Sequence, residues 1–244
     1  MRLTVLGCWS PMPRTGGACA GYLLEEGQTR VLIDCGHAVS SFIGRHVDYN
    51  RLDAIVLTHL HDDHQADVYA LRQAIAIDLR LGLRQGRMPV WSLDQPAAEW
   101  ERLQMPFALE THRYAPGDGF TVGELAFATA PTIHALPCAA LRVTGGGRTF
   151  VFSADTAPSP VVTEHARDAD LFLCEATYRR PGDGPVNIHL AAAEAGAMAA
   201  AAGVRRLLLT HFHPRQDPEA QAALAREAYG GPCEAAVEGR TYEV

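Results

Sequence analysis

Short apolar runs alternate with stretches of helical spacing along the whole chain. Runs bounded by glycine or polar residues predict strands at 3–6, 21–24, 29–33, 54–57, 89–93, 124–130, 140–144, 149–152, 171–174 and 206–210, and a short strand closes the chain. Helical spacing predicts helices at 97–103, 160–167, 191–202 and 218–229, and one more that begins at a histidine-rich segment after residue 57. Two strand-rich stretches, each followed by alternating helices and strands, predict two packed sheets with helices outside.

Composition narrows the class of protein. With 244 residues, 48% of them hydrophobic, and no linker-like segment, the chain is expected to form a single domain over 1–244. The net charge of −7 argues against a generally basic nucleic-acid-binding surface. The chain opens with a strand pattern rather than a secretory signal, and no apolar run is long enough to span a bilayer. We therefore expect a cytoplasmic protein that does not bind membranes.

The segment His59-Leu60-His61-Asp62-Asp63-His64 directly follows the predicted strand at 54–57. Imidazole nitrogens and carboxylate oxygens at this density suit one or two divalent first-row metal ions. The alternative is a solvated, histidine-rich loop, but such a loop seldom follows a buried strand so directly. The segment therefore predicts a metal site.

Three further residues with metal-ligand side chains lie where predicted strands end. They are His134, Asp155 and His211. Each one alone would be interpreted as a loop histidine or a helix-capping aspartate. Because loops at one edge of a rigid sheet gather functional groups, all three together with the segment 59–64 predict one shared site.

The chain resembles the metallo-β-lactamase superfamily from its first strand to past His213. The resemblance lies in the motif His-x-His-x-Asp-His, followed along the chain by a further His, an Asp and a last His. The resemblance implies the α/β fold of that family, an αββα sandwich of two mixed β-sheets with helices on the outer faces. It also implies two divalent metal ions per chain, zinc or manganese, with iron possible. The implied ligands are His59, His61 and His134 for one ion, Asp63, His64 and His211 for the other, and Asp155 with a hydroxide bridging both.

Two residues near the predicted ligands could orient them. Thr58 and Asp34 are candidates for holding ligand imidazoles in place. For Asp34, a turn-capping carboxylate before Gly36 is an equally good interpretation.

Three later segments resemble the phosphodiesterase branch that includes ribonuclease Z: 174–178, 189–194 and 210–215. This resemblance implies catalytic roles for three residues, Asp63, Glu175 and His189. Glu175 would orient His189, which would donate a proton near the scissile phosphate. Alternatively, His189 caps the alanine-rich helix at 191–202. His213 and Arg215 could contact a phosphate oxygen, although a surface ion pair explains Arg215 equally well.

The interval between His134 and Asp155 is only twenty residues, enough for a hairpin. Ribonuclease Z of the usual bacterial kind carries a basic tRNA-binding arm there, so tRNA 3′-processing is disfavoured. The opening segment and the region around Asp155 most resemble small bacterial hydrolases of the YhfI type. The resemblance further implies a homodimer.

These features favour a phosphodiesterase that cleaves a cyclic nucleotide or a short single-stranded RNA through a metal-bridging hydroxide. The runner-up is a hydrolase of carboxylic esters, thioesters or lactones that uses the same site. A metal-binding protein without turnover is the third class, and an open set of ligands argues against it.

Overall fold

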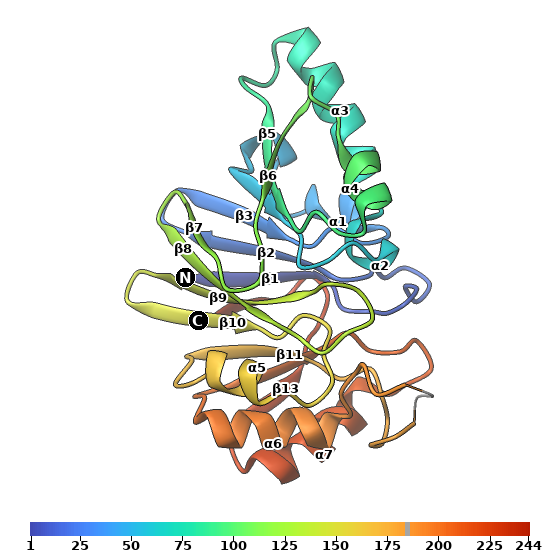
Figure 1. The fold of residues 1–244 in the computed structure, drawn as a ribbon, viewed down its shortest axis with the longest axis vertical. Coiled ribbons are helices and arrows are strands. Elements are labelled where there is room, and N and C mark those ends of the chain that lie inside the picture. Colours follow the sequence, from blue (N-terminus) through green and yellow to red (C-terminus); the bar gives the residue numbers. More distant parts are fainter. Residues whose placement is uncertain (184–185) are drawn as a thin grey trace.

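The computed structural model describes residues 1–183 and 186–244, whose strands form two seven-stranded sheets (Figure 1). The first sheet has the order β14 (Thr241–Glu243), β1 (Arg2–Gly7), β2 (Gly21–Glu26), β3 (Thr29–Ile33), β4 (Ala54–Val56), β5 (Met88–Ser92) and β6 (Leu109–Arg113). The second sheet has the order β13 (Cys233–Ala235), β12 (Leu207–Thr210), β11 (Leu171–Glu175), β10 (Arg148–Phe152), β9 (Ala139–Gly145), β8 (Leu125–Pro131) and β7 (Gly119–Val122). Both sheets mix parallel and antiparallel pairs.

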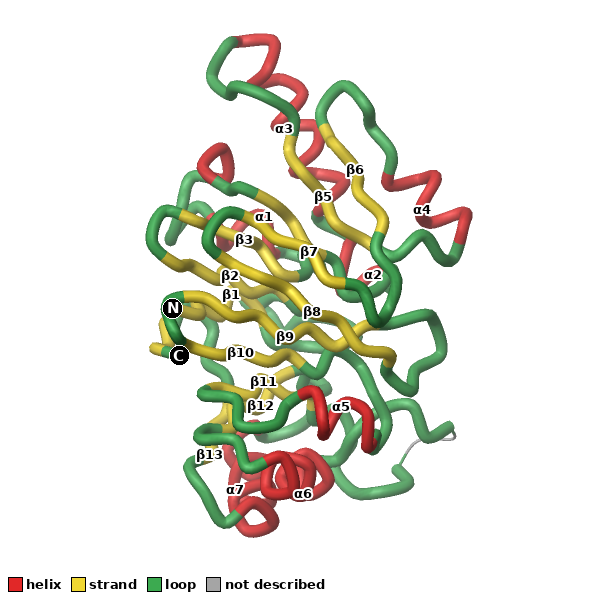
Figure 2. Tube along the Cα trace, turned by 60° about the vertical axis from the view of Figure 1, so that its left-hand side comes forward, coloured by secondary structure: helices red, strands yellow, loops and turns green. Residues whose placement is uncertain are grey.

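Helices cover the outer sides of the two sheets (Figures 1 and 2). Beside the first sheet lie α1 (Val39–Ile43), α2 (Asp62–Gln65), α3 (Val68–Leu81) and α4 (Ala97–Leu103). Beside the second sheet lie α5 (Pro160–His165), α6 (Ala192–Ala202) and α7 (Pro218–Tyr229). This arrangement confirms the predicted sandwich. No helix in the described part of the chain is long and apolar enough to cross a membrane.

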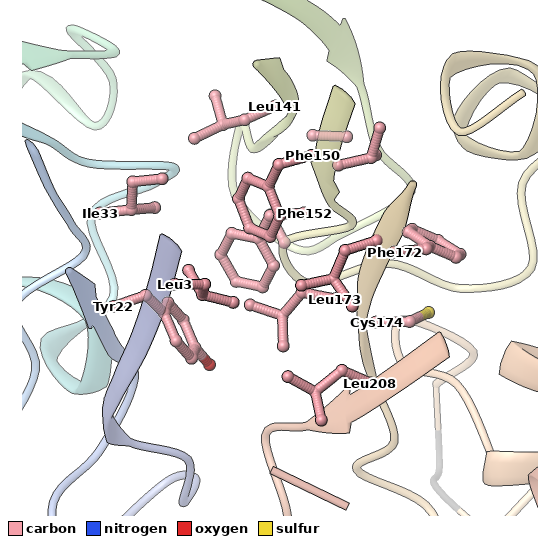
Figure 3. Packing of buried hydrophobic residues seen from close by; sticks show 14 of the residues in the cluster. Leu3, Tyr22, Ile33, Leu141, Phe150, Phe152, Phe172, Leu173, Cys174 and Leu208 are labelled. Atoms are coloured by element: carbon pink, nitrogen blue, oxygen red, sulfur yellow. The ribbon is translucent and has the colours of Figure 1, made fainter. Parts of the chain in front are cut away.

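Strands β1 to β4 of the first sheet are buried on both faces over most of their length, which explains their nearly continuous apolar runs. One face of β2 and β3 turns Tyr22 and Ile33 toward the other sheet, where Phe150 and Phe152 pack (Figure 3). The rings of Tyr22 and Phe152 are 5.0 Å apart between centroids. The opposite face turns Leu23 toward the helices of the first sheet.

Most predicted elements appear within a few residues of their expected bounds, and the differences have physical reasons. Strand β6 was missed because Leu109 is followed by the polar run Glu-Thr-His-Arg, which carries no apolar pattern. The chain ends in two short strands instead of one, and the last, β14, pairs with β1. The segment after residue 57 starts a short helix, α2, before the longer α3 begins.

The parallel strands position the functional region. β3 and β4 lie side by side in the first sheet, and β10, β11 and β12 lie side by side in the second. The carboxyl ends of neighbouring parallel strands share one edge of a sheet. The segments that follow these strands therefore meet at one edge of the sandwich.

Candidate metal centre

All seven predicted metal ligands lie together at this edge. The ligand atoms of His59, His61, His134 and Asp155 form one group within 4.8 Å of one another. Those of Asp63, His64 and His211 form a second group with the same spread. Four of the seven follow β4, while the others follow β8, β10 and β12. The structure thus joins residues from both sheets into one cluster.

The two histidines of the second group present lone pairs to each other. Nδ1 of His64 lies 2.8 Å from Oδ2 of Asp34, so the imidazole N–H is donated there. Nδ1 of His211 lies 2.7 Å from the hydroxyl of Thr177, which donates its own proton to Glu175. Both Nε2 atoms are therefore unprotonated in the neutral rings, yet they lie 3.0 Å apart. Two acceptors this close require a positive charge between or beside them.

The first group repeats this arrangement. Thr58 donates its hydroxyl proton to Asp34 and accepts from Nδ1 of His59 at 3.1 Å. Nδ1 of His134 lies 3.2 Å from the carbonyl of Ile188. In the neutral rings, the lone pairs of His59 Nε2 and His134 Nε2 consequently point at Nδ1 of His61. The two distances to that atom are 3.1 Å from His59 and 3.0 Å from His134.

Asp155 lies between the two groups. Its Oδ2 is 3.7 Å from the Nε2 atoms of His59 and of His134. Its Oδ1 is 3.4 Å from Nε2 of His64 and 3.2 Å from that of His211. Oδ1 is buried and has no hydrogen-bond donor among the described residues. A buried carboxylate oxygen without a donor, surrounded by imidazole nitrogens, fits a divalent cation.

The pKa shifts in the metal-free cluster differ from one candidate ligand to the next. Burial, and then the neighbouring His64, hold the pKa of His59 well below its ordinary value, which keeps the ring neutral. Burial opposes ionisation of Asp155, but the adjacent His211 and His64 outweigh it and hold the pKa of the carboxyl well below its usual range. Burial works against a charged His64, but the neighbouring carboxylates, Asp155 first, outweigh it and raise the pKa of that ring well above its ordinary value. His64 must therefore release its proton when a metal binds, since the neutral imidazole is the ligand form.

Backbone strain is concentrated at the same place. Asp34, Ala154 and His211 have φ angles of 54°, 50° and 61°, in the left-handed region that favours glycine. Such strain persists at functional sites because the surrounding structure holds it. Gly36 is also required, since a Cβ there would lie 1.8 Å from the carbonyl oxygen of Asp63.

Asp34 orients the ligands instead of capping the turn before Gly36. Its carboxylate accepts the backbone N–H and the hydroxyl of Thr58 as well as the imidazole N–H of His64. It is completely buried. One carboxylate thus fixes a histidine of each group.

Glu175 and His189 form a pair at the rim of the cluster. Nδ1 of His189 lies 2.9 Å from Oε1 of Glu175. Burial works against a charged ring, but Glu175 outweighs it and raises the pKa of His189 to about 9. The residue that caps α6 is Ala191, whose N–H is bound by Glu194, so His189 is not a helix cap.

A cleft of about 460 Å³ opens onto the cluster. Its lining residues are Ser10, Pro11, His37, His61, Asp62, Asp63, Asp155 and His189. A larger hollow, of about 710 Å³, lies beside α5 and contains none of the clustered histidines. His213 and Arg215 follow β12 but do not line the cleft, and Arg215 is exposed. Their contact with substrate stays a prediction.

Two hydroxyl groups of the site were not found from the sequence. Thr177 connects His211 to Glu175, and Ser10 donates to Oδ2 of Asp63 at 2.7 Å. The Thr177 hydroxyl lies two residues after Glu175, which is the only signal the sequence offered. Serine and threonine are too common for their types alone to mark a site.

Comparison with known proteins places the chain in a family. The model of the "Beta-lactamase superfamily domain" matches residues 29–212. The probable metallo-hydrolase YhfI of Bacillus subtilis is 34% identical over 87% of each chain. The crystal structure of YhfI superposes with a TM-score of 0.95, at 30% identity, and covers 100% of this chain and 99% of its own.

More distant similarity extends to enzymes of phosphate chemistry. Ribonuclease Z of Myxococcus xanthus is 26% identical over 100% of this chain and 98% of its own. A diphosphatase from the PhnP family shares the fold, with a TM-score of 0.78 at 19% identity, covering 100% of this chain and 97% of its own. The chain therefore belongs to the beta-lactamase superfamily and is a metallo-hydrolase of that fold.

Proposed function

We propose that this protein is a two-metal phosphodiesterase that cleaves a cyclic nucleotide or a short single-stranded RNA. The observation that carries the proposal is the Glu175–His189 pair at the rim of the histidine cluster. The buried carboxylate of Glu175 lies 2.9 Å from the His189 imidazole and favours its protonated form. The protonated ring is then a proton donor beside the residues that would bind the cations.

In this proposal His59, His61 and His134 would hold one ion, and Asp63, His64 and His211 would hold the other. Asp155 could serve both, since each of its oxygens faces the histidines of a different group. Zinc and manganese suit these nitrogen and oxygen ligands, and iron is compatible with them. Divalent ions held there would generate a nucleophile from water at neutral pH and neutralise charge on phosphoryl oxygens.

The remaining chemistry belongs to the chain itself. Glu175 accepts hydrogen bonds from the backbone of Thr156 and Leu190, so its carboxylate is fixed before substrate binds. It holds Nδ1 of His189, which leaves the other ring nitrogen to give a proton to the departing oxygen. Departure of an alkoxide from phosphorus is the step that such a donor accelerates.

The substrate class is supported by the relatives and by the size of the cleft. Ribonuclease Z and the PhnP-family diphosphatase carry names that describe cleavage of phosphate bonds. A cleft of about 460 Å³ matches a small substrate. Between His134 and Asp155 the chain forms the β9–β10 hairpin without an additional arm, which disfavours tRNA 3′-processing.

The second candidate is hydrolysis of a carboxylic ester, thioester or lactone at the same centre. The match to the beta-lactamase superfamily favours it, because a lactamase hydrolyses a carbonyl compound and not a phosphodiester. For a thioester His189 would have a smaller role, because a thiolate leaves more readily than an alkoxide. Esters and lactones release an alkoxide and would use the same proton donor.

A substrate panel distinguishes these candidates. The purified protein, loaded with Zn²⁺ or Mn²⁺, is assayed on bis-p-nitrophenyl phosphate, cyclic mononucleotides, a short single-stranded RNA, a tRNA precursor, a thioester and a lactone. We expect turnover of the first three. Turnover of only the thioester or lactone would replace the phosphodiesterase proposal with the second candidate.

We also propose that the protein is a homodimer, and that 1–244 acts as one domain. Size-exclusion chromatography with light scattering tests the first point. A mass near 26.4 kDa would contradict it, since that is the mass of one chain.

A further inference from the structure

We infer that Ser10 is a positioning residue for the metal ion at Asp63, His64 and His211. The inference rests on the proposed two-metal centre. It concerns a residue outside the predicted ligand set, contributed by a segment near the amino terminus. Ser10 contacts two parts of this group: its hydroxyl is hydrogen-bonded to Asp63, and its backbone N–H is hydrogen-bonded to Phe212, next to His211.

The hydroxyl of Ser10 donates to Oδ2 of Asp63 at 2.7 Å. The same oxygen is the one that faces the histidine pair, 3.5 Å from Nε2 of His211 and 3.7 Å from Nε2 of His64. Ser10 is 4% exposed, so water does not substitute for its hydroxyl. The bond therefore selects which oxygen of Asp63 points at the cation, and fixes the rotation of the carboxylate.

The backbone of Ser10 is held against the other ligand of this group. Its N–H donates to the carbonyl of Phe212 at 3.0 Å, one residue after His211. Phe212 in turn donates to the carbonyl of Cys8 at 2.8 Å, and Trp9 and Phe212 form a parallel bridge. Since Asp63 follows a strand of the first sheet and His211 a strand of the second, Ser10 links the two halves of the group.

The segment that carries Ser10 is itself fixed. Nε of Arg14 donates to the carbonyl of Pro214 at 2.7 Å, and the guanidinium lies 4.1 Å from the ring of Trp9. A second bond from Arg14 reaches the carbonyl of Gln216. The hydroxyl of Ser10 is thus presented from a preformed loop, as expected of a group that orients a metal ligand.

The two groups depend on Ser10 to different extents. The group around His59 has three histidines besides Asp155, none of which contacts Ser10. In the group around His64 the two histidines are held by Asp34 and Thr177, and the third member, Asp63, is held by the hydroxyl of Ser10. Loss of the Ser10 hydroxyl should therefore weaken one metal site and spare the other.

The test compares Ser10→Ala, Ser10→Thr and Ser40→Ala with the wild type, each stripped of metal and titrated with Zn²⁺ against a chromophoric chelator. Ser40 is the matched control, because its hydroxyl donates to Oδ2 of Asp67 at 2.6 Å, away from the metal ligands. Orienting partners of metal ligands are worth roughly 10- to 100-fold in metal affinity. We expect Ser10→Ala to lose that much affinity at one of two sites, Ser10→Thr to recover it, and Ser40→Ala to match the wild type.

Two additional readouts separate positioning from folding. The thermal unfolding midpoint of metal-free Ser10→Ala should match that of the metal-free wild type, while the absorption spectrum of the Co²⁺-loaded variant should change. Equal affinity in Ser10→Ala and wild type overturns the inference, and so does an equal loss in Ser40→Ala. If the wild type itself binds no Zn²⁺, the two-metal proposal fails, and the inference with it.

Discussion

The Nε2 atoms of His64 and His211 lie 3.0 Å apart although the residues are 147 positions apart in the chain. In each neutral ring Nδ1–H donates its proton to an oxygen, so the facing Nε2 atoms are both acceptors. The fold holds the two nitrogens at a separation that requires a proton or a metal cation between or beside them. We expect a bound metal ion to add to the stability of the protein.

Removing metal should therefore lower stability. A ligand that binds only the folded state adds roughly 3–4 kcal/mol when its concentration is 100 to 1,000 times its Kd. We expect the thermal unfolding midpoint to fall by several degrees in a strong chelator and to return on addition of Zn²⁺. An unchanged midpoint, with metal content verified by elemental analysis, would contradict a cation between these histidines.

Replacing His189 should separate catalysis from metal binding. In His189→Ala, hydrolysis of a cyclic mononucleotide, which releases an alkoxide, should fall by about 10²- to 10⁴-fold, the usual contribution of a positioned proton donor. Hydrolysis of bis-p-nitrophenyl phosphate should fall much less, because p-nitrophenolate leaves without a proton. The metal content should stay at the wild-type value, because His189 is outside the two proposed ligand groups. A variant that loses both activity and metal would show that His189 is a ligand. Its ring nitrogen lies within 4.8 Å of the ligand atoms of Asp155 and His211, which is close enough for that.

The pKa of His189 should depend on Glu175. In the metal-free protein the His189 ring should titrate at about 9, and in Glu175→Gln its pKa should move down toward the ordinary 6.5. NMR of the imidazole carbons follows both values. A titration unchanged by Glu175→Gln would show that the carboxylate does not set the charge of this ring.

The same shift gives stability a defined pH dependence. Because folding raises the pKa of His189 above 6.5, protonation of the ring favours the folded state. This contribution is complete below about pH 6.5 and is lost as pH rises through about 9. Urea unfolding of metal-free protein between pH 6 and 10 should show the decline, and His189→Ala should lack it.

Substituting Asp34 tests the support beneath both groups. Asn tolerates the left-handed backbone at this position, where φ is 54°, so Asp34→Asn changes the charge with little strain. We expect metal affinity to fall by roughly 10- to 100-fold, since His64 and Thr58 lose their carboxylate. Isothermal titration with Zn²⁺ measures this change, and Asp62→Asn, at an exposed carboxylate of the cleft rim, is the control that should not alter it.

Much of the site could be predicted because its ligands directly follow apolar strands. The segment 59–64 follows β4, and His134, Asp155 and His211 follow β8, β10 and β12. Metal-ligand side chains are uncommon enough that their positions at strand ends carry information. The positions of Ser10 and Thr177 in the sequence say little about the site, because hydroxyl residues occur throughout the chain. They act here only through the hydrogen-bond partners that the fold brings to them.

Sequence by itself determined most strands and helices and the set of candidate metal-ligand side chains, since local apolar periodicity and residue chemistry can be recognised along the chain. Tertiary structure alone decided how the lone pairs converge, which oxygen of Asp155 faces which histidines, and that β14 returns to pair with β1. It also decided that Asp34 orients ligands and that His189 binds Glu175 instead of capping α6. These features depend on contacts between residues far apart in the chain, and no local pattern encodes such contacts.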